Sequence, residues 1–186
     1  MTVIRYKGDR AVSFEHSFPD DFILVVDTRE QDALFKRPVK GLVMVRDTIP
    51  VGDYSVRGFE REIVVERKSL NDLYSSMFGD WERESKKLVK IAEYNRKWLL
   101  IEGTEDEVLR YQQFSTVHPN SMRGRLVSIQ IRLGIPVYYS ATRKDAERFI
   151  LDVLIKYYRV KREGAGTHGH NRLEGTVQEV VDDAGV

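Results

Sequence analysis

Three short runs of the chain are wholly apolar, and charged residues follow soon after each: FILVV (22–26), IVV (63–65) and WLLI (98–101). A strand with one face in water alternates apolar and polar residues, so unbroken runs of this length predict strands buried on both faces. Segments between and after these runs show helical spacing of apolar residues, most strongly over 142–162. Alternating strands and helices predict an α/β fold, a central mixed sheet flanked by helices.

The patterns of apolar and turn residues place the expected elements. Ser69 and Thr142 each stand three residues before an aspartate, the spacing of a helix N-terminal capping box. Strands are expected at 22–27, 41–48, 51–56, 62–68, 97–103 and 136–141, and helices at 33–35, from 69, at 81–95, at 120–134 and at 142–162.

The chain divides into three expected regions. Residues 1–21 form an N-terminal extension with room for one short strand, and residues 22–162 form one domain. Residues 163–186 are rich in glycine and then acidic, which is typical of a flexible tail.

Composition restricts the compartment and the chemistry. The 186 residues include no cysteine, so a disulfide framework and a thiolate metal site are both excluded. No apolar run approaches the ~18–20 residues of a membrane span, and the N-terminus lacks the apolar centre of a secretion signal. We expect a cytoplasmic or nucleoid-associated protein, neither secreted nor membrane-bound. The net charge is only +1, yet residues 117–140 hold three arginines and no acid, and such a local basic face can bind phosphates.

Charged side chains gather where the strand IVVERK ends. Because side chains alternate along a strand, Glu66 and Lys68 are expected on one face and Arg67 on the other. Asp53 follows a glycine on the preceding strand, and hairpin pairing would bring it beside Glu66. Asp27 ends the first strand. Strand ends of an open sheet are where α/β proteins gather sites, so we expect these groups to lie together.

A further acid, Asp72, lies in the first turn of the helix that begins after Ser69. Carboxylates crowded together repel, and Mg²⁺ or Mn²⁺ is the hard, oxygen-ligated cation that relieves this repulsion. Such an ion can activate a water and neutralise charge on phosphorus. A protonated Lys68 would position and polarise the attacking water or stabilise the transition state. The chemistry predicted is metal-dependent hydrolysis of a phosphodiester.

Each of these residues also has a purely structural interpretation. Asp72 could do no more than cap its helix, and Asp27 could belong to a charged turn. Glu66 and Lys68 could form a cross-strand pair on a wet edge. The occurrence of all of them in order, each at the end of an element, favours the catalytic interpretation.

The same residues resemble a known family. The ordered blocks VVDTRE, VGDY, ERKSLND, WLLIEG, VHPNSMRGRL and GIPVYYS resemble the nuclease domain of the XPF-type structure-specific endonucleases, including the Hef-like archaeal members. The family signature is DxRE, then GD, a spacer, ERK, three residues and D, and it is complete between Asp27 and Asp72. The resemblance runs from about Phe22 to Tyr158.

This resemblance implies a restriction-endonuclease-like core that cuts branched DNA, such as flaps and forks, with Mg²⁺ or Mn²⁺, in repair or recombination. Family members usually carry a tandem helix-hairpin-helix module, for which the residues after 162 are too few and too polar. The roles implied are metal ligands at Asp53, Glu66 and the Arg67 main-chain carbonyl, a catalytic Lys68, further acids at Asp27 and Asp72, and a supporting shell of Arg29, Glu30 and the Arg67 side chain.

Two partner surfaces are expected. Helix 144–158 carries a wider apolar stripe than one buried face needs, and the resemblance implies dimerisation through the last two helices, so a homodimer through residues 120–158 is predicted. The alternative is that the sheet of the same chain covers the whole stripe. DNA, branched or duplex, would be bound by phosphate contacts from Lys86, Lys87 and Lys90, expected to be exposed, and from Arg123 and Arg125.

Two other interpretations compete with that of an active endonuclease. One is a catalytically silent DNA-binding or scaffold subunit of a nuclease complex. The other is a structural or interaction domain whose charges only cap helices. Retention of several mutually repelling acids argues against the silent subunit.

Overall fold

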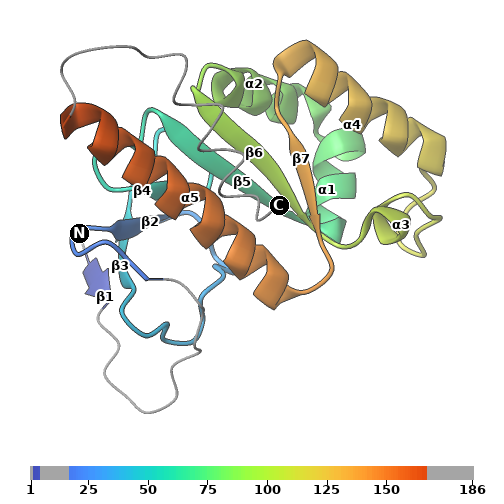
Figure 1. Cartoon of the computed structure of the whole chain (residues 1–186). Helices are drawn as coiled ribbons and strands as arrows, with labels where there is room; N and C mark the ends of the chain where they lie inside the picture. The colour runs from blue at the N-terminus through green and yellow to red at the C-terminus, as the bar shows by residue number, and fades with distance from the viewer. Residues whose placement is uncertain (1, 5–16, 167–186) are drawn as a thin grey trace, which may run out of the picture.

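A seven-stranded mixed sheet forms the centre of the molecule (Figure 1). The structure, a computed structural model, describes residues 2–4 and 17–166. The strand order is β1-β3-β2-β4-β5-β6-β7; β2 runs parallel to β3, β6 runs parallel to β5 and β7, and the other neighbours are antiparallel. The strands are β1 (Thr2–Ile4), β2 (Ile23–Asp27), β3 (Val43–Asp47), β4 (Tyr54–Val56), β5 (Ile63–Ser69), β6 (Arg96–Glu102) and β7 (Val137–Ser140).

Helices cover both faces of this sheet, which confirms the predicted α/β sandwich. Helix α5 crosses one face, and α1, α2 and α4 lie against the other (Figure 1). The helical elements are α1 (Leu70–Tyr74), the π-helical turn η1 (Ser75–Gly79), α2 (Trp81–Ala92), α3 (Glu105–Val108), α4 (Pro119–Leu133) and α5 (Arg143–Gly166). No helix within the described ranges 2–4 and 17–166 is long and apolar enough to cross a membrane.

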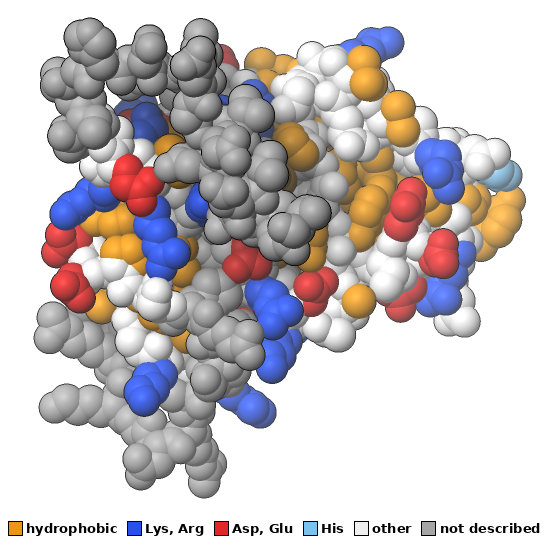
Figure 2. Space-filling model, viewed as in Figure 1, with side chains coloured by type: hydrophobic (Ala, Val, Ile, Leu, Met, Phe, Trp, Pro, Cys, Tyr) orange, Lys and Arg blue, Asp and Glu red, His pale blue; other side chains and the backbone are white. Residues whose placement is uncertain are grey.

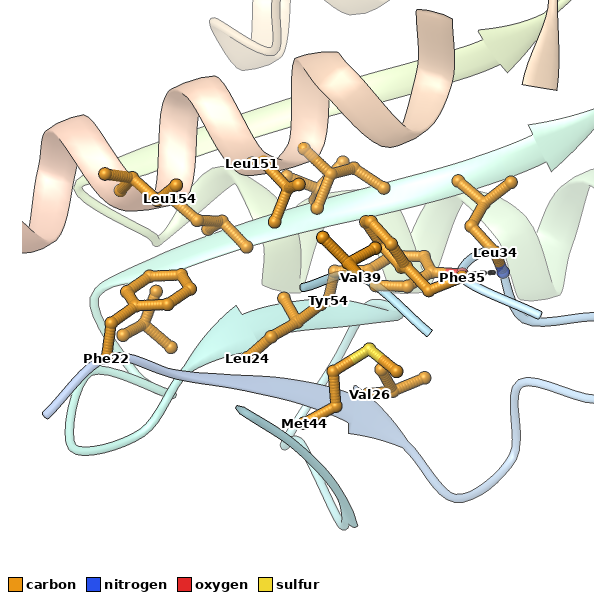
Figure 3. Packing of buried hydrophobic residues seen from close by; sticks show 14 of the residues in the cluster. Phe22, Leu24, Val26, Leu34, Phe35, Val39, Met44, Tyr54, Leu151 and Leu154 are labelled. Atoms are coloured by element: carbon orange, nitrogen blue, oxygen red, sulfur yellow. Dashed lines mark hydrogen bonds between the residues drawn. The ribbon is translucent and has the colours of Figure 1, made fainter. Parts of the chain in front are cut away.

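The core beneath α5 fixes the strands that carry the candidate site. Leu151 and Leu154 of α5 point toward the sheet, and Tyr54 of β4 lies at the centre of this cluster (Figure 3). The Tyr54 hydroxyl is buried but satisfied, because it accepts a hydrogen bond of 2.7 Å from the amide of Leu34. This bond ties the loop after β2 to β4, one residue from Asp53.

Several local predictions were wrong. The expected helix at 33–35 is irregular, because Phe35 has φ of 60°, a left-handed conformation that ends any helix, while its ring anchors the loop in the core. Two short elements, α3 and η1, were not predicted from the sequence. Helix α5 continues to Gly166, four residues beyond the expected end at 162, and the predicted tail after it lies outside the described residues. The short strand expected in the extension is β1.

The apolar width of α5 does not require a partner, so that argument for a dimer was wrong. Ile150, Leu151 and Leu154 are buried against the sheet within the same chain. Phe149 stacks on the Tyr138 ring with centroids 3.8 Å apart. The stripe is wide because the twisted sheet and the flanking aromatic rings cover more than one face of the helix.

Candidate active site

The hairpin of β4 and β5 places Asp53 beside Glu66. The Asp53 amide donates to the Val65 carbonyl at 3.0 Å, and the Arg67 amide donates to the Asp53 carboxylate at 2.7 Å. Gly52 makes this approach possible: its φ is +85°, and a Cβ there would lie 2.2 Å from a Val64 methyl. The glycine before the aspartate is therefore needed to bring the two strands together at the carboxylate.

Glu66 and Lys68 share one face of β5, as predicted from strand periodicity. The Lys68 ammonium lies 3.4 Å from Glu66 Oε1, and both side chains are buried. The Arg67 side chain points to the opposite face, where it contacts the carboxylates of Glu30 and Glu102. Arg67 thus ties the loop after β2 to β6 beneath the site, which is a supporting position.

Helix α2 contributes two side chains, Glu84 and Lys87, that were not predicted to lie in the site. Glu84 Oε2 accepts a hydrogen bond of 2.9 Å from Lys68, and Lys87 lies 2.5 Å from Glu66 Oε1. Lys87 was expected to be fully exposed, but it is half-buried, with 34% of its side chain exposed, because it pairs with Glu66. The available signal for Glu84 was its position one turn before the core residue Leu88, which puts an acid on the apolar face of α2.

The three acids of this cluster, Asp53, Glu66 and Glu84, outnumber its two lysines. Glu66 is 1% exposed and Glu84 is 2% exposed, yet Glu66 Oε2 and Glu84 Oε1 have no hydrogen-bond partner among the described residues. Burial and the neighbouring charge of Glu66 raise the pKa of Asp53 well above its ordinary value, although Lys87 opposes the shift. Burial lowers the pKa of Lys87, but Glu66 and Asp53 outweigh it and leave the pKa raised, so Lys87 stays protonated.

These features fit a divalent cation. A buried carboxylate oxygen without a donor, next to a carboxyl whose pKa is raised, is what remains when acids converge with too few cations. Within the described part of the chain, no three acidic or histidine side chains form a ready-made metal cage. Two carboxylates suffice for Mg²⁺, which commonly completes its shell with waters and substrate phosphates.

Asp27 lies at the end of β2, where its carboxylate fixes a turn. One oxygen accepts from the Arg29 amide and Nε at 2.8 and 2.7 Å, and the other from Arg29 Nη2 at 2.9 Å and the Ile49 amide at 2.8 Å. Burial alone would raise the pKa of Asp27, but these donors outweigh it and the pKa lies below its ordinary value. With both oxygens occupied, Asp27 supports the site in this conformation.

Asp72 does not join the cluster in this conformation. Its exposed carboxylate accepts from the Ser69 hydroxyl at 2.6 Å, while the Asp72 amide donates back to that hydroxyl at 3.2 Å. This is the capping interaction at the start of α1. The structure therefore brings together Asp53, Glu66 and Lys68, with Asp27 beside them, and places Asp72 at a helix cap.

The expected DNA contacts differ in their surroundings. Lys86 and Lys90 are exposed, and Lys86 pairs with Glu82 at 2.7 Å. Arg123 is exposed and lies 3.6 Å from Glu105, whereas Arg125 is half-buried against aromatic rings. On the face shown in Figure 2, basic and acidic side chains are interspersed, in keeping with a net charge of +1.

Replacing Asp27 with Asn is expected to lower the free energy of unfolding by about 1–3 kcal/mol, because buried donors lose a charged acceptor. The folded-state pKa lies below the unfolded value, so this contribution is present at neutral pH and is lost as pH falls through the folded pKa. Urea unfolding at pH 7 measures the effect. Glu82→Gln, in an exposed ion pair, is the control, and equal stabilities for the two variants would refute the role.

The sheet, the helices on both its faces and the cluster at the ends of β4 and β5 define a restriction-endonuclease-like α/β domain. The family model described as the ERCC4 domain matches residues 26–153, and the chain belongs to this family. The XPF-type resemblance found in the sequence is thereby confirmed.

Two curated proteins are similar to the chain. An XPF protein of Saccharolobus solfataricus, named a 3′-flap repair endonuclease, is 24% identical over 154 residues, which are 81% of this chain and 62% of that protein. A Methanocaldococcus jannaschii protein named as an ATP-dependent RNA helicase is 29% identical over 137 residues, 65% of this chain and 15% of that protein. The chain thus spans less than two thirds of either relative.

Solved structures share the fold. XPF from Aeropyrum pernix superposes with a TM-score of 0.59 at 21% identity, covering 77% of this chain and 69% of that one. A second structure of that protein, a complex with DNA, gives a TM-score of 0.56 at 22% identity, covering 75% and 66%.

Proposed function

We propose that this chain is a Mg²⁺-dependent endonuclease that hydrolyses phosphodiester bonds in branched DNA, such as flaps and forks, in repair or recombination. The observation that carries the proposal is the meeting of Asp53, Glu66 and Lys68 at one strand end, with a buried Glu66 oxygen that has no donor in the described part of the chain. Membership of the ERCC4 family and the flap-endonuclease relative support the substrate class.

The residues of the site would divide the chemistry. Asp53, Glu66 Oε2 and the Arg67 main-chain carbonyl would hold Mg²⁺ or Mn²⁺, which supplies a more acidic water and neutralises charge on the phosphate. The Lys68 ammonium pairs with two adjacent carboxylates and can donate to a phosphate oxygen as negative charge develops there. Glu84 holds the ammonium in place, Asp27 fixes the loop that leads from Ile49 to Asp53, and Arg67 ties the loop after β2 to β6.

Cleavage of end-labelled DNA tests this function. The purified protein is incubated with a 3′-flap, a fork and a plain duplex, with Mg²⁺ or with EDTA. We expect cleavage of the branched substrates with Mg²⁺ and none with EDTA. Equal cutting in EDTA would refute the metal mechanism, and DNA binding without cutting would show a silent subunit.

We further propose a homodimer, formed through α4. Val127 and Ile131 of α4 are 50% and 81% exposed, an unusual environment for aliphatic side chains one turn apart. A two-fold axis beside α4 would bury Val127 and Ile131 of one copy against the same residues of the other. Light scattering at micromolar concentration should give twice the monomer mass for the wild type and the monomer mass for Ile131→Glu. The neighbouring Gln130→Glu is the charge control, and a monomeric wild type would refute the dimer.

A further inference from the structure

A groove between α2 and α4 is not explained by the cutting chemistry. Its volume is about 460 Å³, in the range of ligand sites. The described residues around it include two arginines, three serines and no acid. The polar and aromatic side chains that line it are Trp81, Ser85, Ser121, Arg125, Ser128 and Arg132.

Trp81 is fixed at the edge of this groove. The Arg125 guanidinium lies 4.3 Å from the centre of the Trp81 ring and 4.5 Å from that of Phe78. Arg125 also donates to the Met77 carbonyl, so it cannot swing away without losing these contacts. Trp81 remains 37% exposed. An indole that is held in place and still partly open is suited to stacking against a planar ligand.

Resting on the proposed nuclease function, we propose that this groove binds a single-stranded arm of the branched DNA substrate. Arginines and serine hydroxyls without an acid complement phosphates, and a fixed tryptophan complements bases. The combination fits a nucleic acid strand better than an apolar helix, which would leave Arg132 and the serines without partners.

The position of the groove also fits a branched substrate. Trp81 and Ser85 of α2 line the groove, whereas Glu84 and Lys87 of the same helix contact the candidate active site. Helix α2 therefore separates the two places, and a helix with its side chains is about 10–12 Å across. A strand leaving the cut junction needs only to cross this one helix to enter the groove.

Tryptophan fluorescence tests the groove directly, since the chain has two tryptophans. Trp98 packs against Phe149 beneath α5, so Trp98→Phe leaves Trp81 as the reporter. Titration of this variant with oligo-dT in EDTA should quench its emission. Trp81→Leu should weaken oligo-dT binding by about tenfold to a hundredfold, as loss of one stacked base predicts.

Charge variants separate groove binding from damage to the fold. Ser128→Asp keeps Trp81 and Arg125 intact and should also weaken oligo-dT binding, while Ser128→Ala should not. Arg132→Gln should reduce the slope of log affinity against log salt by about 0.7. Arg148→Gln removes the same charge from the exposed surface of α5 and should leave the slope unchanged.

Two results would refute DNA binding in the groove without refuting the nuclease function. One is Trp81 emission that oligo-dT does not quench in a protein that cleaves flaps normally. The other is an oligo-dT affinity that is unchanged in Trp81→Leu and Ser128→Asp. Trp81 emission that changes with protein concentration and not with DNA would instead assign the groove to a second copy of the chain. If oligo-dT quenches Trp81 emission but the wild type cleaves no DNA, the groove still binds a single strand and the proposed nuclease function is refuted.

Discussion

Glu66→Gln is expected to lower the rate of DNA cleavage by about 10³-fold or more. A metal ion contributes several kcal/mol of charge stabilisation, and each 1.36 kcal/mol is a factor of ten in rate. The amide keeps the shape of Glu66 but removes the charge that faces Lys68 and Lys87. Single-turnover cleavage of a 3′-flap with saturating enzyme measures the chemical step without the contribution of DNA binding.

The control for this variant lies on the same strand. Glu62 stands next to the start of β5, at the end away from the site, and pairs with Lys161. Glu62→Gln should therefore cleave at the wild-type rate. If Glu66→Gln also cleaves within about tenfold of wild type, Glu66 contributes no more than about 1.4 kcal/mol to the transition state and the proposed site is wrong.

The sheet was the part of the fold most readily predicted, for physical reasons. The runs at 63–65 and 98–101 are apolar because β5 and β6 have helices on both faces. The run at 22–26 is apolar because β2 packs beneath α5 on one face, while Val25 on the other packs against Val45 and Ile49. The capping residues Ser69 and Thr142 correctly predicted where α1 and α5 begin. By contrast, the loop at 33–35 is apolar because it anchors into the core, and local pattern alone does not distinguish such an anchor from a short helix.

The site was predicted only as far as local geometry reaches. Strand periodicity and a hairpin are local, and they placed Glu66, Lys68 and Asp53 together. Glu84 and Lys87 reach the site through the packing of α2 on the sheet, which depends on the whole domain. Three of the four donors to Asp27 come from Arg29, two residues away, but the fourth, the Ile49 amide, is another tertiary contact.

Glu84→Ala is expected to lower the cleavage rate by about a hundredfold, the second largest effect. Glu84 is a positioning residue: it holds the Lys68 ammonium at 2.9 Å, while the other contact, to Glu66, is longer at 3.4 Å. Without Glu84 the ammonium is free to move, and a misplacement of about 1 Å costs a factor of about 10². The loss should appear in kcat, with little change in the KM for DNA, under steady-state conditions.

Matched variants distinguish positioning from general damage to α2. Glu84→Gln keeps an oxygen that can accept from Lys68 and should recover part of the rate. Glu82→Gln, on the exposed side of the same helix, should have no effect. Combining Glu84→Ala with Lys68→Ala should cost little more than Lys68→Ala alone. Fully additive losses would show that Glu84 acts independently of the lysine.

The central claim is that Asp53 and Glu66 converge on one divalent ion beside Lys68. The most direct measurement is a Mn²⁺ titration followed by electron paramagnetic resonance, in which the free ion gives the signal and the bound ion does not. The wild type should bind one Mn²⁺ per protein chain at the site, and Asp53→Asn and Glu66→Gln should each lose it while remaining folded. Binding of equal strength in the wild type and in both variants would contradict the account.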